Sequence, residues 1–208
     1  MDFEDFKFIY VSLDYLKAMH DADSEVFFSD SVAYEKKPHL GILINQTGRK
    51  YVIPLTSAKP KHALWDDVTA TMYRIYEIIN IQTTLVDKDD IVVDLKNKEL
   101  LRRKHIPESE YHNYKQRILS VLEIKKMFPI KDGTYRLADL DLVEELDLEE
   151  RQRRVLMQKE YEFCVHIKDS IKKKASKIYQ KQMDSGKVLK FHCNFKALEQ
   201  VSDMYKIH

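Results

Sequence analysis

Apolar and polar residues alternate most clearly in the first third of the chain. Residues 7–11 are rich in β-branched and aromatic side chains and predict a strand, and residues 14–19 predict a short helix after it. Two further apolar runs, at 39–44 and 51–55, are separated by the turn-forming residues 45–48. This pattern predicts a β-hairpin, in which the chain before the first strand approaches the chain after the second.

Pro54 lies inside the second strand of this hairpin. Because proline has no N–H to donate to a neighbouring strand, we expect the strand to end, bulge or lie at an edge there. Thr56 and Ser57 would then stand at an exposed strand end.

The middle of the chain mixes helical and strand signals. Asp66 and Asp67 can cap a helix, and the apolar residues behind them follow helical spacing and predict one. Further predictions are a short strand at 91–93, a charged helix at 95–105 and a helical segment at 108–116. The run 118–124 fits a helix or a strand by its period alone. The residues that predict the first helix are Val68, Met72, Ile75, Tyr76 and Ile79.

A continuous apolar stripe runs through residues 147–183 and predicts one long helix or two kinked ones that cover the sheet. Gly186 is a natural C-cap, and Asn194 caps a final helix. Strands scattered among helices indicate an α+β fold, and 208 residues fit one domain. The stripe consists of Leu148, Val155, Leu156, Phe163, Ile167, Ile171, Ala175 and Ile178.

The charges nearly cancel, with 35 Lys and Arg against 34 Asp and Glu, so a nucleic-acid contact would need a local basic patch. No apolar run reaches membrane-spanning length and the N-terminus is acidic, which favours a cytoplasmic protein without a membrane partner. Cys164 and Cys193 form no CxxC motif and are expected to be buried free thiols. None of the eight histidines pairs as HxxxH or HExxH, so we expect no metal and no cofactor.

Residues 56–62 hold the densest candidate chemistry. The hydroxyls of Thr56 and Ser57 are followed by Lys59, Lys61 and His62, a cationic hydrogen-bonding corner suited to a phosphate. The hairpin topology brings Lys37, just before its first strand, toward the same corner.

The run from Pro54 to Ser57, followed by Lys59 and His62, resembles the ToxN/AbiQ family, the endoribonuclease toxins of type III toxin–antitoxin systems. The resemblance continues in the same order through most of the chain. It favours a strand for 118–124 and leaves 66–117 as a family-atypical insertion in a single domain, 1–208. The further matching elements are Lys7 and Phe8 followed by Tyr15, Lys37 ahead of Gly41, residues 127–130, and residues 186–199.

The resemblance implies a metal-independent, sequence-selective endoribonuclease. The RNA 2′-hydroxyl would attack the adjacent phosphate and leave a 2′,3′-cyclic phosphate. Ser57 and Thr56 would contact that phosphate, and Lys59 and Lys37 would stabilise its charge or shuttle protons. The structural alternatives are a helix N-cap or an ST-turn for the hydroxyls and solvated loop charges for the lysines. Proline often follows the Thr-Ser pair in the family, whereas this chain has Ala58, so the loop with Lys59 is expected to take a different path.

RNA binding has weaker candidates. Tyr10, Tyr15 and Tyr34 can stack on unpaired bases or be ordinary half-buried aromatics. His62 can act as acid or base, bind phosphate or sit in a surface turn. The candidates for contact with the RNA backbone, each of which can instead belong to a solvated face, are Lys61, Arg102, Arg103, Lys172 and Lys173.

The resemblance also implies a compact, barrel-like antiparallel sheet similar to Kid/MazF toxins and flanked by helices. The implied partner is a small repeated RNA antitoxin, folded as a pseudoknot and assembled with the toxin in a closed heteromeric ring. The substrate would be cellular or phage RNA, and the role phage defence or plasmid maintenance. The alternative is a non-catalytic RNA-binding module or regulator.

Overall fold

The computed structural model describes residues 5–44 and 47–207, so Asn45 and Gln46 of the expected hairpin turn lie outside the described residues. The strands are β1 (Phe8–Val11), β2 (His39–Leu43), β3 (Lys50–Ser57), β4 (Met72–Asn80), β5 (Ile91–Asp94), β6 (Tyr114–Glu123), β7 (Phe128–Pro129) and β8 (Tyr135–Leu137). The α-helices are α1 (Leu13–Ala22), α2 (Val32–Glu35), α3 (Glu99–Arg103), α4 (Leu148–His166), α5 (Lys168–Ser185) and α6 (Phe195–Met204), and the 3₁₀ helices are η1 (Pro60–Leu64), η2 (Glu108–Asn113) and η3 (Ile124–Lys126).

The strands form one eight-stranded antiparallel sheet in the order β4-β6-β3-β2-β1-β8, with β5 paired to β6 and β7 to β3. Among the described residues β4 and β8 stand at opposite ends of this order and do not pair, so the sheet is open. The expected mixed fold with an antiparallel sheet and flanking helices is confirmed. The barrel-like closure and the likeness to Kid/MazF toxins are not.

The strand β3 joins the two halves of the sheet. It pairs with β2 up to the His39–Pro54 pair, and with β6 from Leu55 onward. Because β6 takes over as partner, the strand does not end at Pro54 but continues to Ser57. The side of β3 that faced β2 is left open over its last residues.

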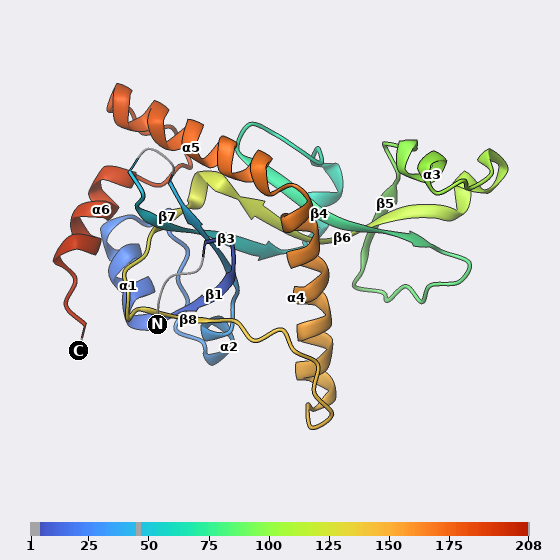
Figure 1. Ribbon diagram of the computed structural model, residues 1–208, viewed down its shortest axis with the longest axis horizontal. Helices are drawn as coiled ribbons and strands as arrows, with labels where there is room; N and C mark the ends of the chain where they lie inside the picture. The colour runs from blue at the N-terminus through green and yellow to red at the C-terminus, as the bar shows by residue number, and fades with distance from the viewer. Residues whose placement is uncertain (1–4, 45–46, 208) are drawn as a thin grey trace.

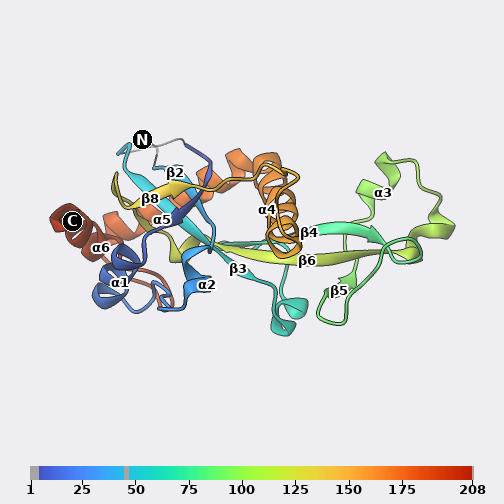
Figure 2. The same cartoon turned by 90° about the horizontal axis from the view of Figure 1, so that it is seen from below.

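Helices cover the sheet in two groups. Figure 2 shows α4 and α5 on the same side of β4 and β6, where Phe163 of α4 packs edge-on against Tyr76 of β4 at 5.3 Å between ring centroids. At the other end α1 and α6 pack together, and α6 also contacts β7. The main core between these layers contains fully buried Leu16, Tyr51 and Phe195, and burial of such large apolar side chains supplies the main driving force for folding.

A separate lobe lies at the far ends of β4 and β6. Figure 1 shows β5 and α3 there, away from α1 and α6. The lobe has a small core of its own, formed by Leu95, Leu101 and Tyr111.

The predicted helix over Val68, Met72, Ile75, Tyr76 and Ile79 is wrong, because residues 72–80 form β4 and pair along β6 over the whole strand. The spacing was ambiguous, since Met72–Ile75 is buried at every position and shows no alternation of apolar and polar residues. Of the predicted helix at 95–105, only Glu99–Arg103 is helical. The segment 108–116 is a 3₁₀ helix over Glu108–Asn113, followed by the start of β6 at Tyr114. The strands at 91–93 and 118–124 are confirmed.

The C-terminal region forms two helices that break at Ile167, as the apolar stripe allowed. Leu148, expected in that stripe, is 72% exposed. Gly186 ends α5 with a left-handed φ of +65°, and the Asn194 side chain accepts the Ala197 N–H, so both predicted caps are confirmed. Both cysteines are buried free thiols. No helix in the described residues has the length and apolar character to cross a membrane.

Candidate functional site

A groove of about 400 Å³ opens where β3 runs beyond the end of β2. One wall is the end of β3, the second is the segment that follows α2, and the third is one face of α4. The residues that matter to its chemistry are Tyr34, Lys37, Thr56, Ser57, Lys59 and Glu160. Four of these lie within the predicted corner, which the fold therefore brings together.

Thr56 and Ser57 reach the groove as the last residues of a paired strand. Thr56 pairs with Val121 and Ser57 with Ser120 of β6. The interpretation of these hydroxyls as a helix N-cap does not hold, because η1 begins at Pro60 and has Lys59 at its N-cap. Their place in a sheet holds both residues in fixed positions.

Lys37 is half-buried and follows α2. Its Nζ lies 4.9 Å from the ring centroid of Tyr34 and 5.1 Å from that of Phe27, and within the described chain it makes no ion pair with a carboxylate. Burial, and to a smaller extent the charge of Lys59, lower the pKa of Lys37 to about 8, while Glu123 opposes the shift. The two lysines therefore act on one another electrostatically across the groove.

Tyr34 presents its ring to the groove while its hydroxyl donates to the Phe27 carbonyl at 2.7 Å. The ring itself packs edge-on against Phe27. This aromatic pair forms the floor on which the Lys37 ammonium rests.

His62 does not face the groove. It is 1% exposed, packs against Trp65, and accepts the Lys59 N–H at Nδ1 over 3.1 Å. Burial and the charge of Lys61 lower the pKa of His62, so the ring is neutral and its proton lies on Nε2. Neither an acid–base role nor phosphate binding by His62 fits this position. The observed contacts of His62 hold the turn of η1. The Nζ of Lys61 lies 5.5 Å from the centroid of the Trp65 ring in the same turn.

Arg74 of β4 anchors the same turn from inside. Its side chain is fully buried and donates to the carbonyl oxygens of His62 at 3.0 Å and Trp65 at 2.9 Å. It also donates from Nε to Asp67 at 2.9 Å. Lys59 is positioned by this anchor, because η1 begins directly after it.

Glu160 is a groove residue that the sequence analysis missed. It is 4% exposed, and burial raises the pKa of its carboxyl to about 7, while the nearby Ser120 hydroxyl lowers it. Arg153, Leu156 and Met157 line the groove from the same face of α4. The available signal was a glutamate in the helical row of Met157 and Cys164, which are both buried.

Two of the predicted base-stacking tyrosines are internal. Tyr15 is fully buried, and its hydroxyl donates to Pro129 O at 3.0 Å and is hydrogen-bonded to Ser202 Oγ at 2.8 Å, so it has no free face for a base. Tyr10 is 3% exposed and lies under the Arg136 guanidinium, 4.5 Å from the ring centroid. Both predictions are corrected by burial, because the core uses these rings for packing.

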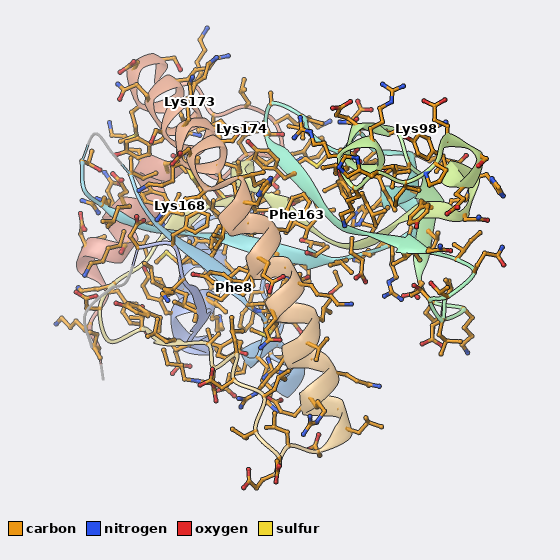
Figure 3. The ribbon with its side chains drawn as sticks, turned by 45° about the vertical axis from the view of Figure 1, so that its right-hand side comes forward. Phe8, Lys98, Phe163, Lys168, Lys173 and Lys174 are labelled. Atoms are coloured by element: carbon orange, nitrogen blue, oxygen red, sulfur yellow. The ribbon has the colours of Figure 1, made fainter. Side chains whose placement is uncertain are left out.

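The predicted basic clusters lie on other surfaces. Arg102 and Arg103 stand on α3 in the lobe and pair with Glu99. Lys172 pairs with Asp5 at 2.8 Å, and Lys173 lines a separate hollow along α5. Figure 3 shows Lys173 and Lys174 on α5 and Lys98 in the lobe on the opposite side of the molecule.

The groove has the parts needed to act on a phosphate group. Hydroxyls and ammonium groups stabilise charge on phosphoryl oxygens, and a carboxyl with a pKa near neutrality can exchange a proton. Across residues 5–44 and 47–207, no three His, Cys, Asp or Glu side chains gather in a way that could hold a metal ion.

Comparison with known proteins gives a consistent result. Residues 7–203 match the family model described as toxin ToxN, type III toxin–antitoxin system. No curated protein sequence matched the chain.

Three solved structures share the fold. One, described in work on a processed non-coding RNA that regulates a bacterial antiviral system, is 22% identical, covers 96% of this chain and 99% of its own, and has a TM-score of 0.62. A toxin inhibited by a non-coding RNA pseudoknot is 20% identical. The match covers 99% of this chain and 100% of that toxin, with a TM-score of 0.66. AbiQ, a lactococcal anti-phage endoribonuclease, is 20% identical. The match covers 97% of this chain and 98% of AbiQ, with a TM-score of 0.65.

Proposed function

The chain belongs to the ToxN toxin family of type III toxin–antitoxin systems, and from this premise we propose that it is an endoribonuclease. The observation that carries the proposal is the meeting of Lys37 and Lys59 with Thr56 and Ser57 on one groove. Lys37 comes from the segment that follows α2, whereas Thr56 and Ser57 end β3 and Lys59 lies in the turn after it, so the fold brings two ammonium groups from separate segments to one groove.

The proposed reaction is a metal-independent cleavage by the RNA itself. The 2′-hydroxyl attacks the adjacent phosphate and leaves a 2′,3′-cyclic phosphate and a 5′-hydroxyl. Ser57 and Thr56 donate hydrogen bonds to the phosphoryl oxygens, and Lys37 and Lys59 stabilise the charge that develops there. Tyr34 lines the groove wall, and contact of its ring edge with a flanking base would support selectivity for sequence.

The proposed inhibitor is a small repeated RNA that folds as a pseudoknot, occupies the same groove and joins the toxin in a closed heteromeric ring. One of the structurally similar toxins is inhibited by a non-coding RNA pseudoknot, which supports this choice of partner. The lysines of α5, Lys172 and Lys173, and the arginines of the lobe, Arg102 and Arg103, would meet RNA outside the groove. In this proposal the segment 66–117, an insertion in a single domain, extends the RNA-binding surface.

The proposed role is defence against phage or maintenance of a plasmid, by cleavage of cellular or phage RNA in the cytoplasm. AbiQ is described as an anti-phage enzyme of this class. A likeness of the antiparallel sheet to that of Kid/MazF toxins belongs to the same proposal.

The test is incubation of the purified protein with total RNA in EDTA. We expect cleavage with cyclic-phosphate ends, and a loss of about 100-fold or more in rate for Ser57→Ala, because one preorganised donor is removed. Ser24→Ala, at an exposed serine in the turn after α1, is the matched control and should cleave as the unmodified protein does. RNA that is bound but stays intact would instead identify a non-catalytic RNA-binding module.

A further inference from the structure

We propose that Glu160 is a catalytic residue, the general base that takes the proton from the attacking 2′-hydroxyl. This inference rests on the proposed nuclease function and deepens it. It assigns the proton acceptor, a role that the hydroxyl and ammonium groups of the groove leave open.

The position of Glu160 follows from strand register. Ser57 pairs with Ser120 across β3 and β6. Directly opposed residues of antiparallel strands point to the same face of the sheet with Cβ atoms about 4.5–5.5 Å apart. Glu160 of α4 lies on this face, near enough to Ser120 for the serine hydroxyl to lower the pKa of the Glu160 carboxyl. The carboxyl therefore stands next to the serine that faces the scissile phosphate.

The side chains of Ser120 and Glu160 have few polar partners within the protein. Ser120 is 1% exposed and its Oγ has no hydrogen-bond partner of normal geometry. Within the described part of the chain Glu160 forms no ion pair. The Ser120 hydroxyl and the Glu160 carboxyl are polar neighbours, and a carboxyl without an ion pair on the wall of an open groove is free to accept a proton from a ligand.

The charges around Glu160 suit a proton acceptor better than a binding group. Lys37 reaches the groove from the segment after α2, Lys59 from the turn after β3, and Arg153 from α4 itself. Cys164, one turn along α4, is a neutral thiol whose pKa is raised by burial and by Glu160. Arg153 is paired with Glu150 at 2.5 Å, so Lys37 and Lys59 are the cations of the groove that can attract a phosphate. A carboxylate repels a phosphate, so the place of Glu160 on the wall of the same groove is useful only if it exchanges a proton.

The step balances without an outside reactant. The Glu160 carboxylate takes the 2′-hydroxyl proton, the bond from O2′ to phosphorus forms and the bond from phosphorus to O5′ breaks. The leaving O5′ takes a proton from the Lys37 ammonium, whose lowered pKa makes it a better acid than an exposed lysine. Exchange with water then returns both groups to their starting states.

The experiment compares Glu160→Gln with Glu162→Gln, an exposed glutamate two residues further along α4. The substrate is a short oligoribonucleotide with a mapped cleavage site, and single-turnover rates are measured from pH 5 to 9. The unmodified protein and Glu162→Gln should rise in rate up to about pH 7 and fall above about pH 8. Glu160→Gln should lose about 100-fold or more and its rise between pH 5 and 7.

A second substrate separates the base from the acid. An oligonucleotide with sulfur in place of the bridging O5′ has a leaving group that needs no proton. We expect it to restore Lys37→Ala and to leave Glu160→Gln slow. Restoration of Glu160→Gln by this substrate would make the glutamate an acid and overturn the proposal.

Folding and binding are checked with the same variants. The affinity of Glu160→Gln for an RNA with a 2′-deoxy nucleotide at the cleavage site should be no lower than that of the unmodified protein. If the glutamine variant does not fold, Glu160→Asp replaces it, and should be slower while keeping the rise between pH 5 and 7.

The two proposals fail differently. An unmodified protein that cleaves no RNA refutes the nuclease function. An unmodified protein that cleaves, with Ser57→Ala inactive and Glu160→Gln unchanged in rate and pH profile, refutes only the role of Glu160.

Discussion

The turn around Arg74 and the groove with Glu160 both hold buried charge, but they are built in opposite ways. Around Arg74 each guanidinium nitrogen is hydrogen-bonded, to Asp67, Gln116 and the carbonyl groups of the η1 turn. In the groove, Lys37 rests on aromatic rings and Glu160 forms no ion pair among the described residues. Both sites remove charge from water, but only the first supplies replacement partners.

The difference separates charge that holds the fold from charge that awaits a ligand. A buried ion that is fully paired recovers much of its desolvation penalty, whereas an unpaired one keeps it and shifts its pKa instead. The shifted pKa values of Lys37 and Glu160 reflect that unrecovered penalty. Perturbed groups that share a groove are therefore the better guide to function.

The largest effect is expected at the paired site. Arg74→Met leaves the Asp67 carboxylate and several buried carbonyl groups without a partner, and should lower the free energy of unfolding by about 3–5 kcal/mol in urea titrations. Adding Asp67→Leu should recover part of the loss, since the orphaned charge is removed. A change below about 1 kcal/mol for Arg74→Met would show that the site is not an anchor.

Lys37→Met should show the reverse pattern. Cleavage should fall by about 100-fold or more, because a charge aimed at the phosphate is lost. The free energy of unfolding should not fall, because the lysine is partly desolvated without a carboxylate partner. Lys196→Met, at an exposed lysine on α6, is the control for removal of a positive charge. Equal losses of activity in the two variants would end the argument for Lys37.

Glu160→Gln should stabilise the protein in a pH-dependent way. The folded carboxyl has a raised pKa, so the native state holds a proton that the unfolded chain releases from about pH 4.5 upward. Wild-type stability therefore falls as the pH rises from about 4.5 to 7, then levels off. The variant should gain about 2–3 kcal/mol at pH 8 and less than about 1 kcal/mol at pH 5. Thermal melts at the two pH values measure this, and a gain equal at both would contradict it.

The smallest effect is expected where charges are paired but exposed. Lys17 and Asp21 form an i,i+4 pair on α1 with both side chains more than half exposed. Asp21→Asn should change the free energy of unfolding by less than about 0.5 kcal/mol, because water screens the pair. A larger loss in urea titrations would mean that pairing alone, without burial, decides the contribution of a charge.

The hairpin and its corner were predictable because their signals are local. Turn residues between two apolar runs gave the strand pairing, and antiparallel geometry then placed Lys37 near Thr56 and Ser57. The caps at Gly186 and Asn194 were also predictable, since each depends on one residue and its immediate neighbours.

The strand β4 and the role of Glu160 were not predictable, because both depend on distant partners. Met72–Ile75 is covered on both faces, so its alternation is hidden and Arg74 looks like an exposed helical residue. Glu160 is one of many glutamates in a charged segment, and only the packing of α4 over β6 buries it. The burial of Tyr15 likewise comes from Pro129 and Ser202, which lie far along the chain.

The order in which the groove is assembled has a consequence for synthesis. Its hydroxyls are translated early, but Ser120 of β6 and the face of α4 that bears Glu160 come more than sixty residues later. A nascent chain that has exposed Ser57 alone has no closed groove, and the proposed nuclease is inert until α4 has left the ribosome. The machinery that makes the toxin is thereby spared while the chain is still being made.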